Sequence, residues 1–300
     1  MDLILIVLPA FLIFGAGFIG QKMLHLNVKS ISTMALYLMT PFLTFETFYS
    51  NKLNIDYFYM FSFSVLLIII LLGVTLFTGW LMKMDKAHMS AMLLGTLFPN
   101  SGNYGAPVVL FAYGTQAFNY AVILMVIHGL LINSIGIFIA SYGGQKSATI
   151  KNAVTSVVKM PNLYGVILGV SFQLLHLKLP STIVDSVSLV GSAAIPTIML
   201  ILGMQLAEIK PQKLEYRYFG TVTLTRMVAS PLIATILVIF MPVSDTIKNV
   251  FILLAAMPVA ANVTMLAVQF DAKPNLVSLT TLITTIISLL TIPLTLFFLG

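Results

Sequence analysis

Residues 98–111 read FPNSGNYGAPVVLF and lie in the middle of a strongly apolar region of the chain. Proline has no backbone N–H, and its ring clashes with the preceding helical turn, so Pro99 is expected to break a helix here. Gly102 and Gly105 permit a short extended stretch after the break, and Pro107 suits the first turn of a restarting helix. The stretch therefore predicts a broken helix within an apolar protein.

The composition of the whole chain is that of a membrane protein. Of its 300 residues, 59% are hydrophobic and 8% are charged, whereas soluble domains contain roughly 25% charged residues. Apolar runs of about 20 residues, the length that crosses a hydrocarbon core, recur along the sequence and predict an all-α membrane protein. An outer-membrane barrel is excluded because its strands would alternate apolar and polar residues. The ten predicted spans are residues 3–20, 31–49, 57–81, 88–112, 117–141, 160–177, 186–207, 219–241, 247–270 and 276–298.

The basic residues predict an orientation in the membrane. Cytoplasmic loops carry an excess of lysine and arginine, and most of the 15 basic residues share one side if both termini are extracytoplasmic. The net charge of +6 is dispersed without a basic stripe, which argues against nucleic acid as a partner. The predicted cytoplasmic residues are Lys22, Lys29, Lys83, Lys86, Lys146, Lys151, Lys159, Lys210, Lys213, Arg217 and Lys273, against Lys52, Lys178 and Lys248 outside.

A second interrupted segment, PVAANVTMLAVQF at residues 258–270, matches the first at one constant offset. Each segment is the fourth of five spans in its half. Because five is odd, the second half is expected to insert upside down, which predicts inverted repeats. The predicted domains are residues 1–145, a cytoplasmic connecting loop at 146–160, and residues 161–300. The identical pairs are Pro99 with Pro258, Asn103 with Asn262, and Phe111 with Phe270.

Two broken helices at corresponding positions predict a binding site. Transporters built from inverted repeats bind substrate near the bilayer midplane at discontinuous helices. Asn103 and Asn262 suit the points where the half-helices restart, because an asparagine side chain caps free N–H groups. Each helix N-terminus carries roughly half a positive charge, so the pair is predicted to bind the carboxylate of a small anion.

Other polar residues within the spans have two interpretations each. Ser101, Tyr104 and Thr264 are candidates for hydrogen bonds to the substrate, with helix contacts as the alternative. For Arg226, snorkelling to the cytoplasmic interface is favoured over a role as a counter-charge for an anion or as an ion-pair partner. For Glu46, an interfacial position is favoured over proton coupling.

Structural roles are expected for the remaining polar and small residues. Helix-to-helix hydrogen bonds are predicted for His128, Asn133 and Gln205. GAGFIG in the first span and GVILG in the sixth are candidates for close-packing faces. The histidines are scattered and cysteine is absent, so no metal site and no cofactor are predicted. No nucleophile motif or phosphate loop indicates an enzyme.

With GNYGAP and MPVAAN set in ten spans arranged as five plus five, the chain resembles the auxin efflux carrier family. That family includes plant auxin carriers and bacterial permeases for malate and similar organic acids. The short loop after the fifth span is similar to the bacterial branch, which implies a bacterial inner (cell) membrane location. The resemblance implies the fold of bile-acid symporters and sodium/proton antiporters, in which the two broken helices cross. It also implies a homodimer, a scaffold of spans one, two, six and seven, and substrate-binding asparagines that match Asn103 and Asn262.

These observations lead to one principal hypothesis and several alternatives. The principal hypothesis is a secondary transporter for a small organic anion, such as a mono- or dicarboxylate, with a proton or a sodium ion as a possible coupling ion. A cation/proton antiporter of the same fold is the first alternative, but neither interrupted segment contains a carboxylate that would bind the cation. A non-transporting receptor or scaffold is the second. An intramembrane enzyme would need paired catalytic groups within the spans.

Overall fold

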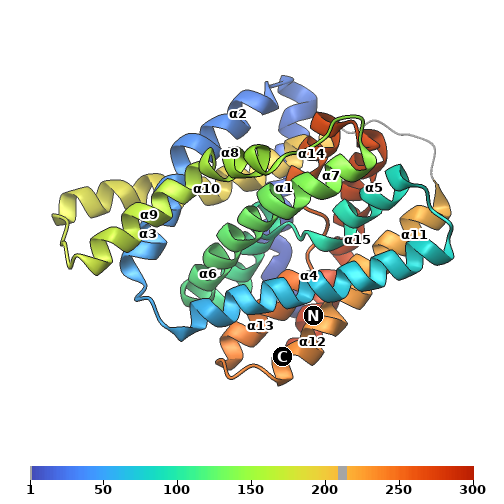
Figure 1. Cartoon of the computed structure of the whole chain (residues 1–300). Helices are drawn as coiled ribbons and strands as arrows, with labels where there is room; N and C mark the ends of the chain where they lie inside the picture. The colour runs from blue at the N-terminus through green and yellow to red at the C-terminus, as the bar shows by residue number, and fades with distance from the viewer. Residues whose placement is uncertain (1, 209–214) are drawn as a thin grey trace. The chain divides into compact units, whose positions relative to one another are not determined.

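The computed structural model describes residues 2–208 and 215–300, with side chains from residue 8 onward (Figure 1). Lys210 and Lys213, two of the predicted cytoplasmic residues, lie outside the described residues. Within the described ranges the regular elements are all helices, and Pro99 and Val259 form an isolated backbone bridge. The predicted all-α class is confirmed.

Helical segments occupy all ten ranges predicted as spans. The first three contain α1 (Asp2–Leu24), then α2 (Val28–Met34), the π-helical turn η1 (Ala35–Met39) and α3 (Thr40–Ser50), then α4 (Ile55–Leu81). The fourth and fifth contain α5 (Lys86–Leu97), η2 (Ser101–Gly105), α6 (Ala106–Leu131), η3 (Ile132–Gly136) and α7 (Ile137–Gly143). After α8 (Ile150–Val158), which lies in the connecting segment, the sixth and seventh are α9 (Pro161–Leu174) and α10 (Ser181–Glu208). The last three contain α11 (Tyr216–Leu224), η4 (Thr225–Ala229), α12 (Ser230–Ile239), α13 (Asp245–Ala255), α14 (Asn262–Phe270) and α15 (Pro274–Leu299).

Several of these segments are long and apolar enough to cross a membrane by themselves. There are five in the described chain, and a sixth if α8 and α9, which are bent by 62°, count as one span. The breaks after α5 and α13 leave half-helices that are too short to be counted alone. The protein is therefore a helical multi-pass membrane protein, and the count of ten spans stays a prediction. The five segments are Ile55–Leu81, Ser101–Gly143, Ser181–Glu208, Tyr216–Ile239 and Pro274–Leu299.

The chain forms two compact units, and each takes spans from both halves of the sequence. The four spans that the resemblance assigns to a scaffold belong to unit 1. This division does not test the repeat relationship between residues 1–145 and 161–300, which stays a prediction. Unit 1 consists of Met1–Phe58, Gly102–Val126 and Val158–Glu208, and unit 2 of Tyr59–Ser101, Ile127–Val157 and Ile209–Gly300.

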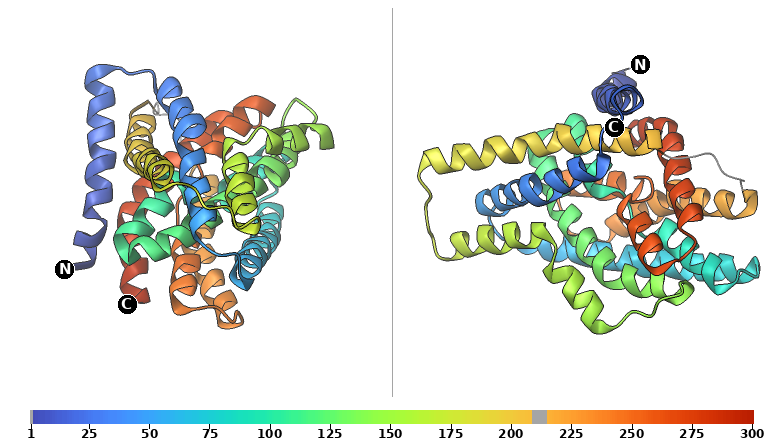
Figure 2. Two further views of the ribbon diagram at one scale, coloured as in Figure 1. Left: turned by 90° about the vertical axis from the view of Figure 1, so that its left-hand side faces the viewer. Right: turned by 90° about the horizontal axis from the view of Figure 1, so that it is seen from above.

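In unit 1, α1 crosses α10 at a point where glycines let the two backbones touch (Figure 2). A Cβ on Gly17 would overlap the backbone carbonyl of Leu200, and a Cβ on Gly203 would overlap that of Phe14. Gly20, also on α1, has open space around it. Of the glycines in GAGFIG, the close-packing role therefore falls to Gly17.

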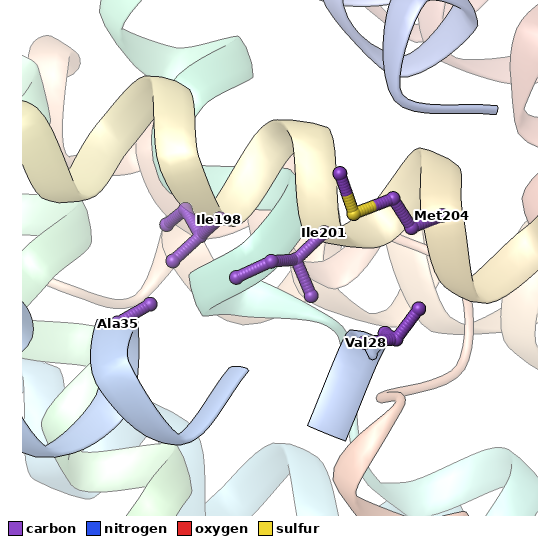
Figure 3. Close-up of a cluster of buried hydrophobic side chains, with 5 residues drawn as sticks. All are labelled: Val28, Ala35, Ile198, Ile201 and Met204. Atoms are coloured by element: carbon purple, nitrogen blue, oxygen red, sulfur yellow. The ribbon is translucent and has the colours of Figure 1, made fainter. Parts of the chain in front are cut away.

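The sixth span packs against the second in the same way. A Cβ on Gly165 of α9 would overlap the backbone oxygen of Pro41, and one on Gly169 would lie 2.8 Å from that of Phe45. The prediction that GVILG forms a close-packing face is confirmed. A small hydrophobic cluster then joins α10 to the start of the second span, with Ile198 and Ile201 of α10 pointing toward α2 and η1 (Figure 3). The cluster consists of Val28, Ala35, Ile198, Ile201 and Met204.

In unit 2, α5 begins at a charged cap. The Asp85 carboxylate accepts a hydrogen bond from the backbone N–H of His88 at 2.8 Å. The imidazole of His88 lies 2.9 Å from Asp85 Oδ2 and 3.2 Å from Glu215 Oε2, so it links α5 to the residue before α11. The backbone hydrogen bond, followed by the side-chain hydrogen bond to His88, holds the pKa of Asp85 below its ordinary value.

This cap predicts a pH-dependent contribution to stability. A carboxyl whose pKa is lowered by folding stabilises the fold above its unfolded pKa, and the stabilisation is lost as the pH falls through the folded pKa. Asp85→Ala should cost about 1 kcal/mol at pH 7 through loss of the cap. Asp85→Asn keeps a capping oxygen, so it should lose less stability than the wild type as the pH falls below about 4. Thermal unfolding in detergent checks this, and equal acid sensitivity of the two proteins would contradict it.

Candidate functional site

The two predicted helix breaks are observed, and they pair with each other in unit 2. Helix α5 ends before Pro99 and α13 ends before Pro258. Some of the backbone groups freed by one break are satisfied by the other, and buried polar groups at membrane depth need such partners. We call residues 98–101 and 256–261 the paired breaks. Their contacts are the antiparallel bridge of Pro99 with Val259, a 2.8 Å hydrogen bond from Asn100 N to Pro258 O, and a 3.0 Å hydrogen bond from Ala260 N to Phe98 O.

The first break is shorter than the sequence predicts. Phe98 is extended, with φ −112° and ψ 109°, but the chain resumes as the π-helical turn η2 at Ser101. The prediction of an extended stretch through Gly102 and Gly105 is therefore wrong. Gly102 serves close packing instead, because a Cβ there would lie 3.0 Å from the sulfur of Met125.

The restarting helix α6 holds an interruption at Gly114, in the connection between the predicted spans 88–112 and 117–141. Pro107 is buried in the first turn of α6, the position expected for it. Further along, Gly114 has φ 77° and ψ −172°, a conformation that residues with a Cβ rarely adopt. The helix is therefore kinked at Gly114.

Neither predicted asparagine caps a helix. The N-cap of α14 is Ala261, which makes no side-chain hydrogen bond, and Asn262 is the exposed first residue of that helix. Thr264 Oγ1 donates to Ala261 O at 2.6 Å and so closes the first turn. Asn103 is half-buried within η2, and no hydrogen bond of its side chain is found in the described part of the chain. The capping prediction is wrong, and binding of substrate by Asn103 in unit 1 and Asn262 in unit 2 stays a proposal.

Asn100, which the sequence reasoning overlooked, is the most unusual polar residue of the paired breaks. Its side chain is 4% exposed, and its Nδ2 is buried with no hydrogen-bond partner among the described residues. A buried donor without a partner costs about 1–3 kcal/mol, so Nδ2 of Asn100 is a donor available to a ligand or a water molecule. The available signal was its position, directly after the proline that breaks the helix.

Ser101 connects the first break to α6. Its hydroxyl lies 2.5 Å from Nδ1 of His128, and both side chains are buried. The predicted helix-to-helix hydrogen bond of His128 is confirmed. That of Asn133 is confirmed as well, since its Oδ1 accepts from Ser156 of α8 at 2.7 Å. The predicted helix-to-helix hydrogen bond of Gln205 is not made by its side-chain oxygen, Oε1, which is buried without a partner among the described residues.

Arg226 lies at the ends of both half-helices. It is fully buried, and its Nε and Nη1 donate to Met257 O and Thr96 O, each at 3.0 Å, while Nη2 donates to Ala255 O. The last carbonyls of a helix have no partner within the helix. Arg226 therefore caps the C-terminal ends of α5 and α13. The snorkelling prediction is wrong because the breaks supply carbonyls that solvate the guanidinium inside the protein.

Tyr104 and Glu46 lie within helix packing in unit 1. The Tyr104 ring is buried and stacks on Phe14 with 5.1 Å between ring centroids, and it also lies 6.3 Å from Phe11. This placement favours the helix-contact interpretation of Tyr104. Glu46 is half-buried on α3. Its carboxylate lies close to α10, since a Cβ built on Gly191 of α10 would be 3.2 Å from Oε2 of Glu46.

No cluster of three or more histidine, aspartate or glutamate side chains that could hold a metal ion occurs in residues 2–208 and 215–300. The polar side chains of the first break are the amide of Asn100 and the hydroxyl of Ser101, and His128 and Arg226 contact the breaks from neighbouring segments.

Comparison with known proteins identifies the family of this chain. The sequence profile of the family described as membrane transport protein matches residues 2–296. An uncharacterized transporter of Methanocaldococcus jannaschii is 24% identical over 303 residues, covering 98% of this chain and 97% of that protein. An uncharacterized transporter of Methanothermobacter thermautotrophicus is 25% identical over 310 residues, covering 98% of this chain and 95% of that protein. The chain therefore belongs to the membrane transport protein family, which is the auxin efflux carrier family that its sequence resembles.

Proposed function

We propose that this protein is a secondary transporter that carries a small organic anion, such as a mono- or dicarboxylate, by alternating access. The observation that carries the proposal is the unpartnered amide of Asn100, buried at the paired breaks of a chain from a transport family. An N–H donor in a water-poor site forms its strongest hydrogen bonds with a charged acceptor. A carboxylate supplies that acceptor.

The distribution of charge in unit 2 also favours an anion over a cation. A cation carrier would need carboxylates in the region of the paired breaks to bind its substrate. The acidic residues of the described part of unit 2 are instead all exposed. This argues against the alternative of a cation/proton antiporter. These residues are Asp85, Glu215, Asp245 and Asp271.

Asn103 and Asn262 complete the proposed substrate-binding residues. The support for them is their matched position in the two interrupted segments and the resemblance to the auxin efflux carrier family. The free amide donors of a helix N-terminus favour negative charge, and Asn262 is the first residue of α14. We further propose a homodimer in the cell membrane with both termini extracytoplasmic, since the basic residues concentrate in one set of loops.

A ligand screen followed by flux measurements tests this function. Purified protein is heated with mono- and dicarboxylates, aromatic acids and amino acids, and we expect at least one organic acid to raise the melting temperature. That acid is then tested for counterflow in proteoliposomes with and without a pH gradient. Binding without flux would favour a receptor over a carrier. Neither binding nor flux with any acid would contradict the proposal.

A further inference from the structure

Three backbone carbonyls at or just before the paired breaks accept hydrogen bonds from one side chain within unit 2. They are the oxygens of Thr96 near the end of α5, Ala255 at the end of α13 and Met257 just beyond it. In secondary transporters with broken helices, unwound carbonyls and half-helix C-terminal ends form the site of a coupling cation. In this protein the guanidinium of Arg226 donates to the carbonyls of these half-helix ends.

We infer that Arg226 is a built-in replacement for a coupling cation. It follows that transport by this protein is independent of sodium, and that removing the side chain leaves a site for a free monovalent cation, preferentially free guanidinium. The part of this inference that concerns transport rests on the proposed function. The part that concerns the cation site does not.

The charges support this assignment. Each helix C-terminus carries roughly half a negative charge, so the ends of α5 and α13 together present about one. Arginine stays protonated in proteins and brings one positive charge in a fixed planar fork. The side chain is fully buried, so this neutralisation is screened little by solvent.

The hydrogen bonds of Arg226 support the same assignment. All three of its described contacts are to backbone carbonyls, not to a carboxylate. Ser230, one turn further along the same helical run, donates to Ala255 O at 2.8 Å and adds to the set of donors. Arg226 is thus neither the partner of an acidic side chain nor a surface group. A sodium ion at the same carbonyls would overlap the guanidinium and be repelled by it.

The wild-type protein provides the first test. Flux of the acid identified in the ligand screen should be unchanged when sodium is replaced on both sides of the proteoliposome membrane by potassium or by choline. Flux that requires sodium would contradict the inference. If no acid is carried, the predicted sodium-independent transport fails together with the proposed function. The binding test below does not need transport and still tests the cation site.

The second test uses purified Arg226→Ala protein and needs no transport. Its melting temperature should lie well below that of the wild type. Guanidinium chloride is added in the low millimolar range, at ten times its Kd for the variant. It should raise the melting temperature of Arg226→Ala by about 3 °C. Tetramethylammonium chloride at the same concentration, which cannot donate hydrogen bonds, should have no effect.

Met227→Ala is the matched control, because Met227 is a buried neighbour of Arg226 in η4 and carries no charge. Its melting temperature should fall without any response to guanidinium. Equal responses of the two variants, or no response of either, would overturn the cation site. If Arg226→Ala fails to fold, Arg226→Lys and Arg226→Gln replace it. The lysine variant should retain the greater melting temperature because it keeps the charge, and equal values would contradict the inference.

Discussion

Transport of the organic acid is expected to fall at least about 10-fold in Asn100→Ala, because a hydrogen bond to a charged group is worth about 1.5–3 kcal/mol. Asn100→Asp should be more severe, since it keeps the shape of the side chain and presents a carboxylate oxygen where the substrate needs a donor. The alanine variant should also fold well, because it removes a donor that is unpartnered in the described chain. Initial rates of counterflow in proteoliposomes, normalised to inserted protein, measure the effect.

Asn133→Ala is the control for this prediction. Asn133 is another amide of unit 2, but both ends of its side chain are engaged, one with Gly129 O and one with Ser156. Its replacement should lower stability and leave the KM for the acid unchanged.

Asn103→Ala and Asn262→Ala are expected to abolish transport while the protein still inserts. Wild-type rates in Asn100→Ala would remove Asn100 from the site, and full transport by the other two variants would remove them.

The contact of α1 with α10 predicts the largest structural effect. Valine at Gly17 or at Gly203 would place a branched side chain onto the backbone carbonyl of the facing helix. No rotamer relieves this overlap, because Cβ is fixed by the backbone, so the two helices must separate. Overpacking of this kind costs about 1–3 kcal/mol or more. We expect each variant to melt several degrees lower, or to be lost from the monodisperse peak in size-exclusion chromatography.

Gly20→Val supplies the comparison for the two glycine variants. It introduces the same side chain as Gly17→Val into the same helix, α1, but the space around Gly20 is open. The intrinsic cost of valine in a helix is therefore matched, and the difference between Gly17→Val and Gly20→Val isolates the contact. Equal melting temperatures for these two variants would show that α1 does not pack on α10 through Gly17.

The sequence predicts the parts of the site that depend on local chemistry. Proline removes a backbone N–H and disfavours a continuing helix, so Pro99 and Pro258 pointed to both breaks. Proline alone was not sufficient, because Pro9, Pro196 and Pro293 lie inside continuous helices. The close-packing face of the sixth span was also identifiable, because the two glycines of GVILG are spaced by about one helical turn. Which glycine of GAGFIG makes the contact depends on the direction from which α10 approaches, and this direction is a property of the folded unit.

Two other predictions failed because they considered one span at a time. Snorkelling of Arg226 was judged from its depth in its own helix, but its partners are carbonyls exposed by breaks in two other spans. Capping by Asn262 was judged from residue type, but the N-cap is the preceding residue, Ala261, and Asn262 is the first residue of the helix. Asn100 was overlooked because its importance comes from being buried without a partner, which only the folded structure reveals.

The central claim is that the paired breaks, with their unpartnered amide and the capping arginine, form the part of unit 2 that receives the anion. A cryo-EM map of the protein with the acid found in the ligand screen tests it most directly. We expect α5 and α13 to end at Pro99 and Pro258, Arg226 to contact their last carbonyls, and a carboxylate oxygen to lie within hydrogen-bond distance of Asn100 Nδ2. A map in which either helix runs on without a break, or in which the acid is bound away from Asn100, would contradict the account.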